Sequence, residues 1–326
     1  MIEQVIQMVT ILSDMKIHSG NSLGEHLGVT RAAVWKLIKK MQDEFGVDVR
    51  SIAGSGYQLV HPINLIDKQQ IDRLLSAATP LSSPINITVL DSCTSTNDEA
   101  MVGAQSGASS LSVWISEHQR AGRGRRGKQW MSPLLGNIYC SILWRTTGGV
   151  QSLEGLSLVI GIAIAQALEK MGVSRVKLKW PNDIWVDDKK LGGILIEIVG
   201  DPIGQCAVVI GFGLNIRLNP TMKSGVTQEI ISLTEEIGEV NRNETITLII
   251  REIAVYLENH SRNGFSSFLD QWSHFDALIG REVIVASVVE SIAGRCEGVS
   301  PRGALLLNVN GELQEIYAGE ISVRPS

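Results

Sequence analysis

The stretch 153-LEGLSLVIGIAIAQALEKM-171 contains the most apolar part of the chain, Leu156–Leu168. Apolar residues recur at positions 153, 156, 160, 164, 168 and 171, which is the spacing of one face of an α-helix. The apolar part contains Gln166, lies between Glu154 and Glu169, and is shorter than the ~20 residues that a membrane span needs. The stretch therefore predicts the core helix of a globular domain rather than a membrane helix.

Strand patterns surround this helix on both sides. Before it, Leu111, Val113 and Ile115 alternate with other residues, and 137–144 is a candidate strand. After it come strand-like runs at 177–186, 191–199 and 207–216, then helical stretches at 244–259 and 265–274. We expect an α+β catalytic domain with one mixed sheet, spanning residues 85–276.

The first 62 residues have a different pattern. Val5, Met8, Val9 and Leu12 form an apolar helical stripe, and a second short helix is expected at 22–27. Gly28 can adopt a positive φ, and Thr30 is a good N-cap for a third helix. Strand-like runs at 47–50 and 57–60 then flank Gly54-Ser55-Gly56. Residues 1–62 are predicted to form a winged helix-turn-helix.

The third helix carries four positive charges and no acid between Thr30 and Met41. The major groove of DNA, about 12 Å wide, admits one helix, whose basic residues neutralise phosphate. Because the net charge of the chain is −5, DNA binding must come from such a local patch. The alternative is a helical domain for protein contacts with a solvated lysine face. The candidate DNA-binding residues are Arg31, Trp35, Lys36 and Lys39.

The remaining segments are a linker and a small C-terminal domain. Residues 63–84 contain a helical stretch at 67–77 and a Ser/Pro-rich piece, and are predicted to be a linker. Short strands with glycine-containing turns predict a small β-barrel over 277–326. The four cysteines are far apart, which favours buried apolar side chains over disulfides or a zinc site. With no secretory signal either, we expect a cytoplasmic protein with no membrane partner.

Residues 118–153 contain no acid, yet they include the basic loop 122-GRGRRGKQW-130. Alternating glycines let backbone N–H groups approach an anion, and arginine forks bind phosphate. The spacing is not that of a Walker phosphate-binding loop. Taken alone, the loop could equally cradle a nucleotide, bind RNA or be a solvated segment.

Three other clusters contain polar groups at the ends of expected elements. They are 94-TSTN-97, 179-KWPND-183 and 189-KKLGGIL-195. Each also has a plain interpretation: a helix N-cap, the closure of a hairpin and a solvated turn, respectively.

Together, in this order, these motifs resemble the biotin protein ligase family. The match is to its bifunctional bacterial type, which also represses the biotin operon, and it spans nearly the whole chain. It includes 211-GFGLN-215, 303-GALLL-307 and 319-GEIS-322. The resemblance implies an N-terminal winged helix, a mixed-sheet catalytic domain and a C-terminal SH3-like β-barrel. It also implies an ATP-dependent biotin–[acetyl-CoA-carboxylase] ligase, which forms biotinyl-5′-AMP and transfers biotin to a carrier-protein lysine.

The resemblance also implies roles for individual residues. Biotin would be bound by Ser95, Thr96, Asn97, Gln119, Arg123, Gly124, Arg125 and Lys190. ATP would be bound by Arg123, Arg125, Arg126, Trp130, Asn182 and Asn215. The catalytic residues would be Lys190, Arg125 and Asp183, with Lys190 reaching the biotin carboxylate and the α-phosphate. Asp183 would orient the acceptor lysine, and Trp130 would stack near the adenine.

The implied partners are the biotin carboxyl carrier protein of a carboxylase, operator DNA and a second copy of the chain, with biotinyl-5′-AMP as corepressor. Mg²⁺ is expected with ATP, without assignable ligands. Two positions depart from the family pattern, which has arginine where this chain has Lys128 and a basic wing tip where it has Ser55. They place the geometry of the loop and the strength of operator binding in question.

Three other functions compete with this interpretation. A lipoate or octanoate transferase would need a long apolar slot instead of the polar pocket at Ser95, Thr96 and Gln119. A biotin-sensing repressor without ligase activity is disfavoured by Lys190 and by the complete arginine loop. The third alternative is a ligase that has lost DNA binding.

Overall fold

The N-terminal segment folds into three helices and a two-stranded hairpin. The computed structural model describes residues 2–79, 81–200, 204, 206–218, 228–286, 291–317 and 322–325. The first elements are α1 (Ile2–Leu12), α2 (Gly20–Leu27), α3 (Arg31–Phe45), β1 (Val49–Ile52) and β2 (Gly56–Leu59). The predicted stripe of α1 is fully buried, Gly28 is left-handed, and the Thr30 hydroxyl accepts a hydrogen bond from the Ala33 amide. The predicted winged helix-turn-helix is confirmed.

The central domain is built on a seven-stranded mixed sheet. Its strand order is β3-β4-β5-β9-β8-β7-β6, in which only β3 and β4 are parallel. The strands are β3 (Asn86–Leu90), β4 (Ser112–Ser116), β5 (Ile138–Thr146), β6 (Val176–Lys179), β7 (Asp183–Val186), β8 (Lys189–Gly200) and β9 (Cys206–Leu214). The run expected at 177–186 is two strands, β6 and β7, which pair with each other across the turn at Pro181.

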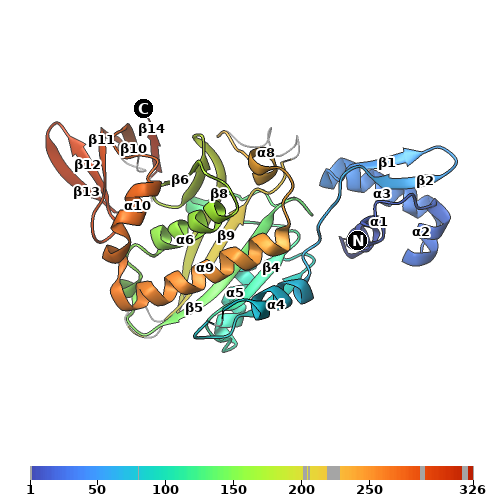
Figure 1. Ribbon diagram of the computed structural model, residues 1–326, viewed down its shortest axis with the longest axis horizontal. Coiled ribbons are helices and arrows are strands. Elements are labelled where there is room, and N and C mark those ends of the chain that lie inside the picture. The colour runs from blue at the N-terminus through green and yellow to red at the C-terminus, as the bar shows by residue number, and fades with distance from the viewer. Residues whose placement is uncertain are drawn as a thin grey trace.

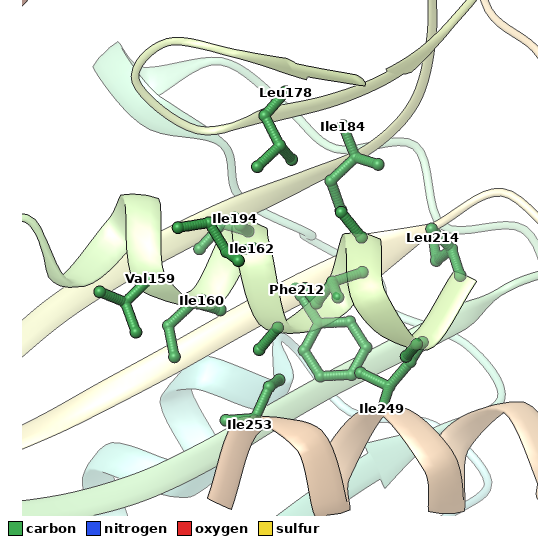
Figure 2. Close-up of a cluster of buried hydrophobic side chains, with 14 of the residues drawn as sticks. Val159, Ile160, Ile162, Leu178, Ile184, Ile194, Phe212, Leu214, Ile249 and Ile253 are labelled. Carbon is green, nitrogen blue, oxygen red and sulfur yellow. The ribbon is translucent and has the colours of Figure 1, made fainter. Parts of the chain in front are cut away.

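Helices cover both faces of this sheet. On one face lie α6 (Leu156–Lys170) and α9 (Arg242–Asn263), and their apolar side chains meet those of β9 (Figures 1 and 2). Helix α5 (Thr96–Gln105) packs on the other face, against Leu143, Ala207 and Val209. Shorter helices are η1 (Arg125–Gly127), η2 (Val150–Leu153), α8 (Leu233–Ile237), η3 (Phe265–Phe268) and α10 (Leu269–Phe275).

Helix α6 is the buried centre of the domain. With η2 it forms the segment Val150–Lys170, whose length and composition would suffice to cross a membrane, contrary to the expectation that it is too short. However, 11 of the 15 residues of α6 are buried. Val159, Ile160 and Ile162 belong to the same apolar cluster as Ile249 and Ile253 of α9 (Figure 2). These contacts are those of the core helix that the sequence predicts.

The C-terminal domain is a five-stranded antiparallel sheet of order β13-β12-β11-β10-β14. Its strands are β10 (Glu282–Ala286), β11 (Ser291–Val299), β12 (Leu305–Val309), β13 (Glu312–Ile316) and β14 (Ser322–Pro325). Strand β14 was not expected from the sequence. The Trp180 indole N–H donates to the Gly303 carbonyl at 3.1 Å, which attaches this sheet to the turn between β6 and β7.

A buried ion pair connects the linker to the catalytic domain. Arg242 and Glu117 have side chains only 3% exposed, with an Arg242 Nη1–Glu117 Oε2 distance of 2.8 Å. Arg242 Nε also donates to the Asn64 carbonyl, and the Ile66 amide donates to Glu117. Helix α4 (Lys68–Ala77) then packs its Ile71 into the central core. This part of the 63–84 segment therefore packs as part of the central domain.

The winged helix also contacts the central domain directly. Leu134 and Leu135, which follow the basic loop, belong to the apolar cluster formed by α1, α2 and α3. The rings of Phe45 and His118 meet edge to face, with centroids 6.3 Å apart. The segment that follows the loop is thus shared between the two domains.

We predict that Arg242→Ala lowers the free energy of unfolding by about 3–5 kcal/mol, because it leaves the Glu117 carboxylate buried without its partner. Urea denaturation measures the change. Arg262→Ala is the matched control on the same helix, since its side chain is 71% exposed in its pair with Glu258. Equal losses for the two variants would contradict the prediction.

Candidate functional site

The floor of the site is one face of β9, where Gly211 and Gly213 have no side chain to cover the backbone. A Cβ atom at Gly211 would lie 2.1 Å from Asn97 Oδ1. A Cβ atom at Gly213 would lie 2.5 Å from the indole of Trp130. Both separations are far inside van der Waals contact, so any side chain there would displace Asn97 or Trp130.

A buried polar network lies at the start of α5. The Ser95 hydroxyl caps the helix and accepts from the Asn97 amide. The amide and hydroxyl of Thr96 donate to Gln119 Oε1 at 2.8 and 3.2 Å. The Ser141 hydroxyl contacts Thr96 Oγ1 at 2.7 Å and Asn97 Oδ1 at 2.5 Å. The neutral side chains of this network can donate and accept hydrogen bonds without adding charge to the pocket.

The basic loop is a short hairpin. The Trp130 amide donates to Gly122 O at 2.9 Å, and the Gly124 amide donates to Lys128 O at 2.7 Å. We call Gly122–Gly124 with Lys128–Trp130 the stem, and Arg125–Gly127 the tip. Gln119 Nε2 donates to Ser132 Oγ, which donates in turn to Trp130 O, so the polar network continues into the stem.

Lys190 and Asp183 meet beneath this loop. Lys190 Nζ lies 2.7 Å from Asp183 Oδ1, and their side chains are 18% and 15% exposed. The same Nζ lies 5.4 Å from the ring centroid of Trp130. From the tip, Arg125 donates to Asn182 Oδ1 at 3.2 Å. Burial lowers the pKa of the Arg125 guanidinium, and the nearby Asp183 charge opposes that shift.

The main chain of Lys190 is held on both sides. Its amide donates to Glu229 O at 2.9 Å, and its carbonyl accepts from the Ile231 amide at 3.0 Å. Asn215 Nδ2 donates to the carbonyls of Lys190 and Ile231 at 3.3 and 3.2 Å. The side-chain amide of Asn215 thus contacts the main chain of Lys190 and of its neighbour Ile231.

The structure therefore gathers the predicted biotin, ATP and catalytic residues around one site, except that Arg126 is exposed at the tip of the loop. The predicted DNA-binding residues lie elsewhere, on α3 (Figure 1). Arg31, Trp35, Lys36 and Lys39 are all exposed there. Lys39 Nζ lies 5.6 Å from the Trp35 ring.

Four further side chains were not among the sequence candidates. Ser141 and Ser132 complete the polar network, whereas Asp98 and Glu197 contact Arg123. Glu197 had a recognisable signal, because it is an acid inside the apolar run 191–199. Lys179 also lies near the site. Burial lowers the pKa of Lys179, although the Asp183 charge raises it, and its ammonium lies 4.8 Å from the Trp185 ring.

We predict that Gly211→Ala lowers the free energy of unfolding by about 1–3 kcal/mol, because its methyl group overpacks the space that Asn97 fills. Urea denaturation again measures this. Gly136→Ala is the control, because a Cβ atom there would contact only the Arg217 carbonyl, at 3.4 Å. A Gly211→Ala protein as stable as the control would show that Asn97 can move aside at no cost.

Comparison with known families matches three segments of the chain. Residues 3–58 match an HTH domain, and residues 278–324 match the biotin protein ligase C terminal domain. Residues 89–215, which include the site from Ser95 to Asn215, match the biotin/lipoate A/B protein ligase family.

Individual relatives agree with these matches. The bifunctional ligase/repressor BirA of Escherichia coli is 37% identical over 98% of this chain and 97% of its own length, and that of Bacillus subtilis is 27% identical over 94% and 93%. The structure of a biotin protein ligase from Aquifex aeolicus in complex with biotin and ATP has a TM-score of 0.64 at 27% identity, covering 74% of this chain and 99% of that one. The chain therefore belongs to the biotin protein ligase family, and within it to the ligase/repressor type that carries an N-terminal helix-turn-helix domain.

Proposed function

We propose that the protein is an ATP-dependent biotin protein ligase and a repressor of a biotin operon. The observation that carries the enzymatic half is the Lys190–Asp183 pair, which lies beneath the basic loop and close to Trp130. It places a cation and a carboxylate between a neutral polar pocket and a phosphate-binding loop.

The polar network suits the ureido ring of biotin. That ring has two N–H donors and one carbonyl acceptor, so it needs a neutral pocket with both kinds of partner. Ser95, Thr96 and Gln119 supply side-chain groups, and the backbone around Arg123, Gly124 and Arg125 supplies further polar groups. Asn97 supports the pocket through Ser141. An apolar slot for a lipoyl or octanoyl chain would not need this arrangement.

In the first step, an oxygen of the biotin carboxylate attacks the α-phosphorus of ATP. A P–O bond forms, the bond to the β-phosphate breaks, and pyrophosphate leaves, giving biotinyl-5′-AMP. Lys190 stabilises the negative charge shared by the carboxylate and the α-phosphate. Arg125 and Arg126 at the tip bind phosphate oxygens, and we assign Trp130, Asn182 and Asn215 to contacts with the adenosine.

In the second step, the amine of a carrier-protein lysine attacks the acyl carbon of the adenylate. An amide bond forms, the acyl–phosphate bond breaks, and AMP leaves while the amine loses a proton. Asp183 orients this amine, since its carboxylate can accept the hydrogen bond. Closure of the loop keeps water from the mixed anhydride until the carrier arrives. The acceptor is the biotin carboxyl carrier protein of a carboxylase.

Mg²⁺ enters with ATP, because in nucleotide sites this ion is bound largely by substrate phosphates and water. Among the residues that the structure describes, no three or more His, Cys, Asp or Glu side chains gather to hold an ion. We therefore assign no protein ligand to it and route no step through it.

The repressor half of the proposal rests on α3. Its exposed Arg31, Lys36 and Lys39 suit phosphate contacts, and Trp35 offers an apolar surface to base edges. Biotinyl-5′-AMP acts as corepressor by favouring a homodimer that meets a palindromic operator. In this proposal, residues 1–62 bind DNA and residues 63–84 link them to the catalytic domain. Residues 85–276 catalyse ligation, and residues 277–326 form the C-terminal domain of the ligase. Because a repressor shares a compartment with DNA, we place the protein in the cytoplasm.

The first functional prediction concerns Lys190. Lys190→Ala should slow biotinyl-adenylate formation by about 10²–10³-fold, the effect of removing one preorganised electrostatic contact. Pyrophosphate release with biotin and Mg·ATP, and biotin transfer to a carrier domain, measure it. Lys189→Ala is the matched control, since that neighbouring side chain is 45% exposed and 4.0 Å from Glu229. A folded wild-type protein that transfers no biotin would refute the proposed ligase activity.

The second functional prediction concerns DNA binding. Lys36→Ala with Lys39→Ala should weaken operator binding and lower the salt slope by about 2, since each phosphate contact contributes about 0.9. Ligation should be unchanged. Lys68→Ala with Lys170→Ala removes the same charge from two exposed sites outside the winged helix. Parallel losses of DNA binding and ligation in the first variant would contradict the division of functions between the domains.

A further inference from the structure

The Arg123 side chain points away from the tip of the basic loop, toward two carboxylates. Arg123 Nη2 lies 2.8 and 3.1 Å from the two carboxylate oxygens of Glu197 on β8. Arg123 Nη1 donates to Asp98 on α5. The three side chains are 26–35% exposed, so the cluster is only partly screened by water. One guanidinium thus meets two acids that come from two separate elements.

Glu197 is itself held in place. Asn97 Nδ2 donates to Glu197 Oε2 at 2.6 Å, and Asn97 Oδ1 accepts from Ser141 at 2.5 Å. Asn97 can reach Glu197 because Gly211 leaves space beneath its amide. Glu197 is therefore part of the same network that forms the polar pocket.

The net charge around Arg123 differs from that around the other arginines of the loop. Two carboxylates more than neutralise one guanidinium, so a phosphate near Arg123 would also meet a net negative charge. Although burial lowers the pKa of Arg123, the hydrogen bonds to Asp98 and Glu197 raise it overall. Arg125, by contrast, donates to the neutral Asn182 beside the Lys190–Asp183 pair.

We propose that Asp98 and Glu197 are positioning residues that hold the stem of the basic loop through Arg123, while the side chains that the loop offers to the nucleotide phosphates are those of the tip. This assignment rests on the proposed ligase function, and it replaces the expected phosphate contact of the Arg123 side chain. Arg123 pairs with Gln129 across the stem, so fixing Arg123 fixes both of its strands. The tip then closes over the adenylate from an anchored base.

Asp98→Asn and Glu197→Gln remove each charge with little change of shape. Each should speed the release of preformed biotinyl-5′-AMP about three- to tenfold, the range for a partly exposed, charge-assisted contact. The KM for ATP should change less than twofold, because Arg125 and Arg126 are retained. In an Arg123→Ala background, Asp98→Asn should not speed adenylate release any further, since the contact between the two side chains is already lost.

Glu99→Gln is the matched control, because it removes the neighbouring acid on the same turn of α5. Urea denaturation of each variant checks that the fold is intact. If Arg123→Ala raises the KM for ATP more than tenfold while the two acid variants retain the adenylate normally, Arg123 binds phosphate and the proposal is wrong. If Glu99→Gln speeds release as much as Asp98→Asn does, the effect is general electrostatics and the proposal also fails.

Tryptic cleavage at the tip provides a readout that does not depend on ligase activity. Without substrates, Asp98→Asn and Glu197→Gln should be cut after Arg125 or Arg126 about three- to tenfold faster than wild type, because a released stem exposes the tip. Unchanged cleavage would overturn the proposal even in an active ligase. Faster cleavage in a protein that forms no adenylate would refute the ligase function and leave the anchoring contact supported.

Discussion

The site depends on two positions of β9 that carry no side chain. Gly211 and Gly213 lie on the same face of the strand, two residues apart, and their backbone is covered by Asn97 and Trp130. Asn97 belongs to the helix that starts the polar pocket, and Trp130 ends the basic loop. Two segments far apart in the chain are therefore placed against one rigid strand, which sets their mutual geometry together with the Arg123–Asp98 contact between them.

The opposite face of β9 explains why this floor is rigid. Val208 and Ile210 belong to the core cluster together with Phe212 and Leu214, which Figure 2 shows beside α6 and α9, while β5 and β8 pair with the strand along both edges. A buried strand with two neighbours and a close-packed lower face has little freedom to shift. The alternation of side chains along one strand thus assigns the core to one face and the ligand site to the other.

Local patterns in the sequence were sufficient for the helices and for the charged loop. The stripes of α1 and α6, the Thr30 cap and the glycine-arginine repeat act over a few residues, and the structure agrees with them. The partners of Arg123 could not be found this way, because Glu197 is 74 residues away and reaches Arg123 only through the register of β8. By contrast, the division of the run at 177–186 did have a local signal, because Pro181, Asn182 and Asp183 interrupt it and close the hairpin between β6 and β7.

The family pattern has arginine at the position of Lys128, and the structure shows that this residue shapes the loop through its main chain. Its carbonyl accepts the Gly124 amide at 2.7 Å and so closes the hairpin, whereas its side chain is exposed. The hydrogen bond that shapes the loop is thus made by main-chain atoms that lysine and arginine share. A planar guanidinium matters where two acceptors must be met at once, as at Arg123, and much less at an exposed position near other cations. At position 128, the hydrogen bond that closes the hairpin is therefore the same with lysine as with arginine.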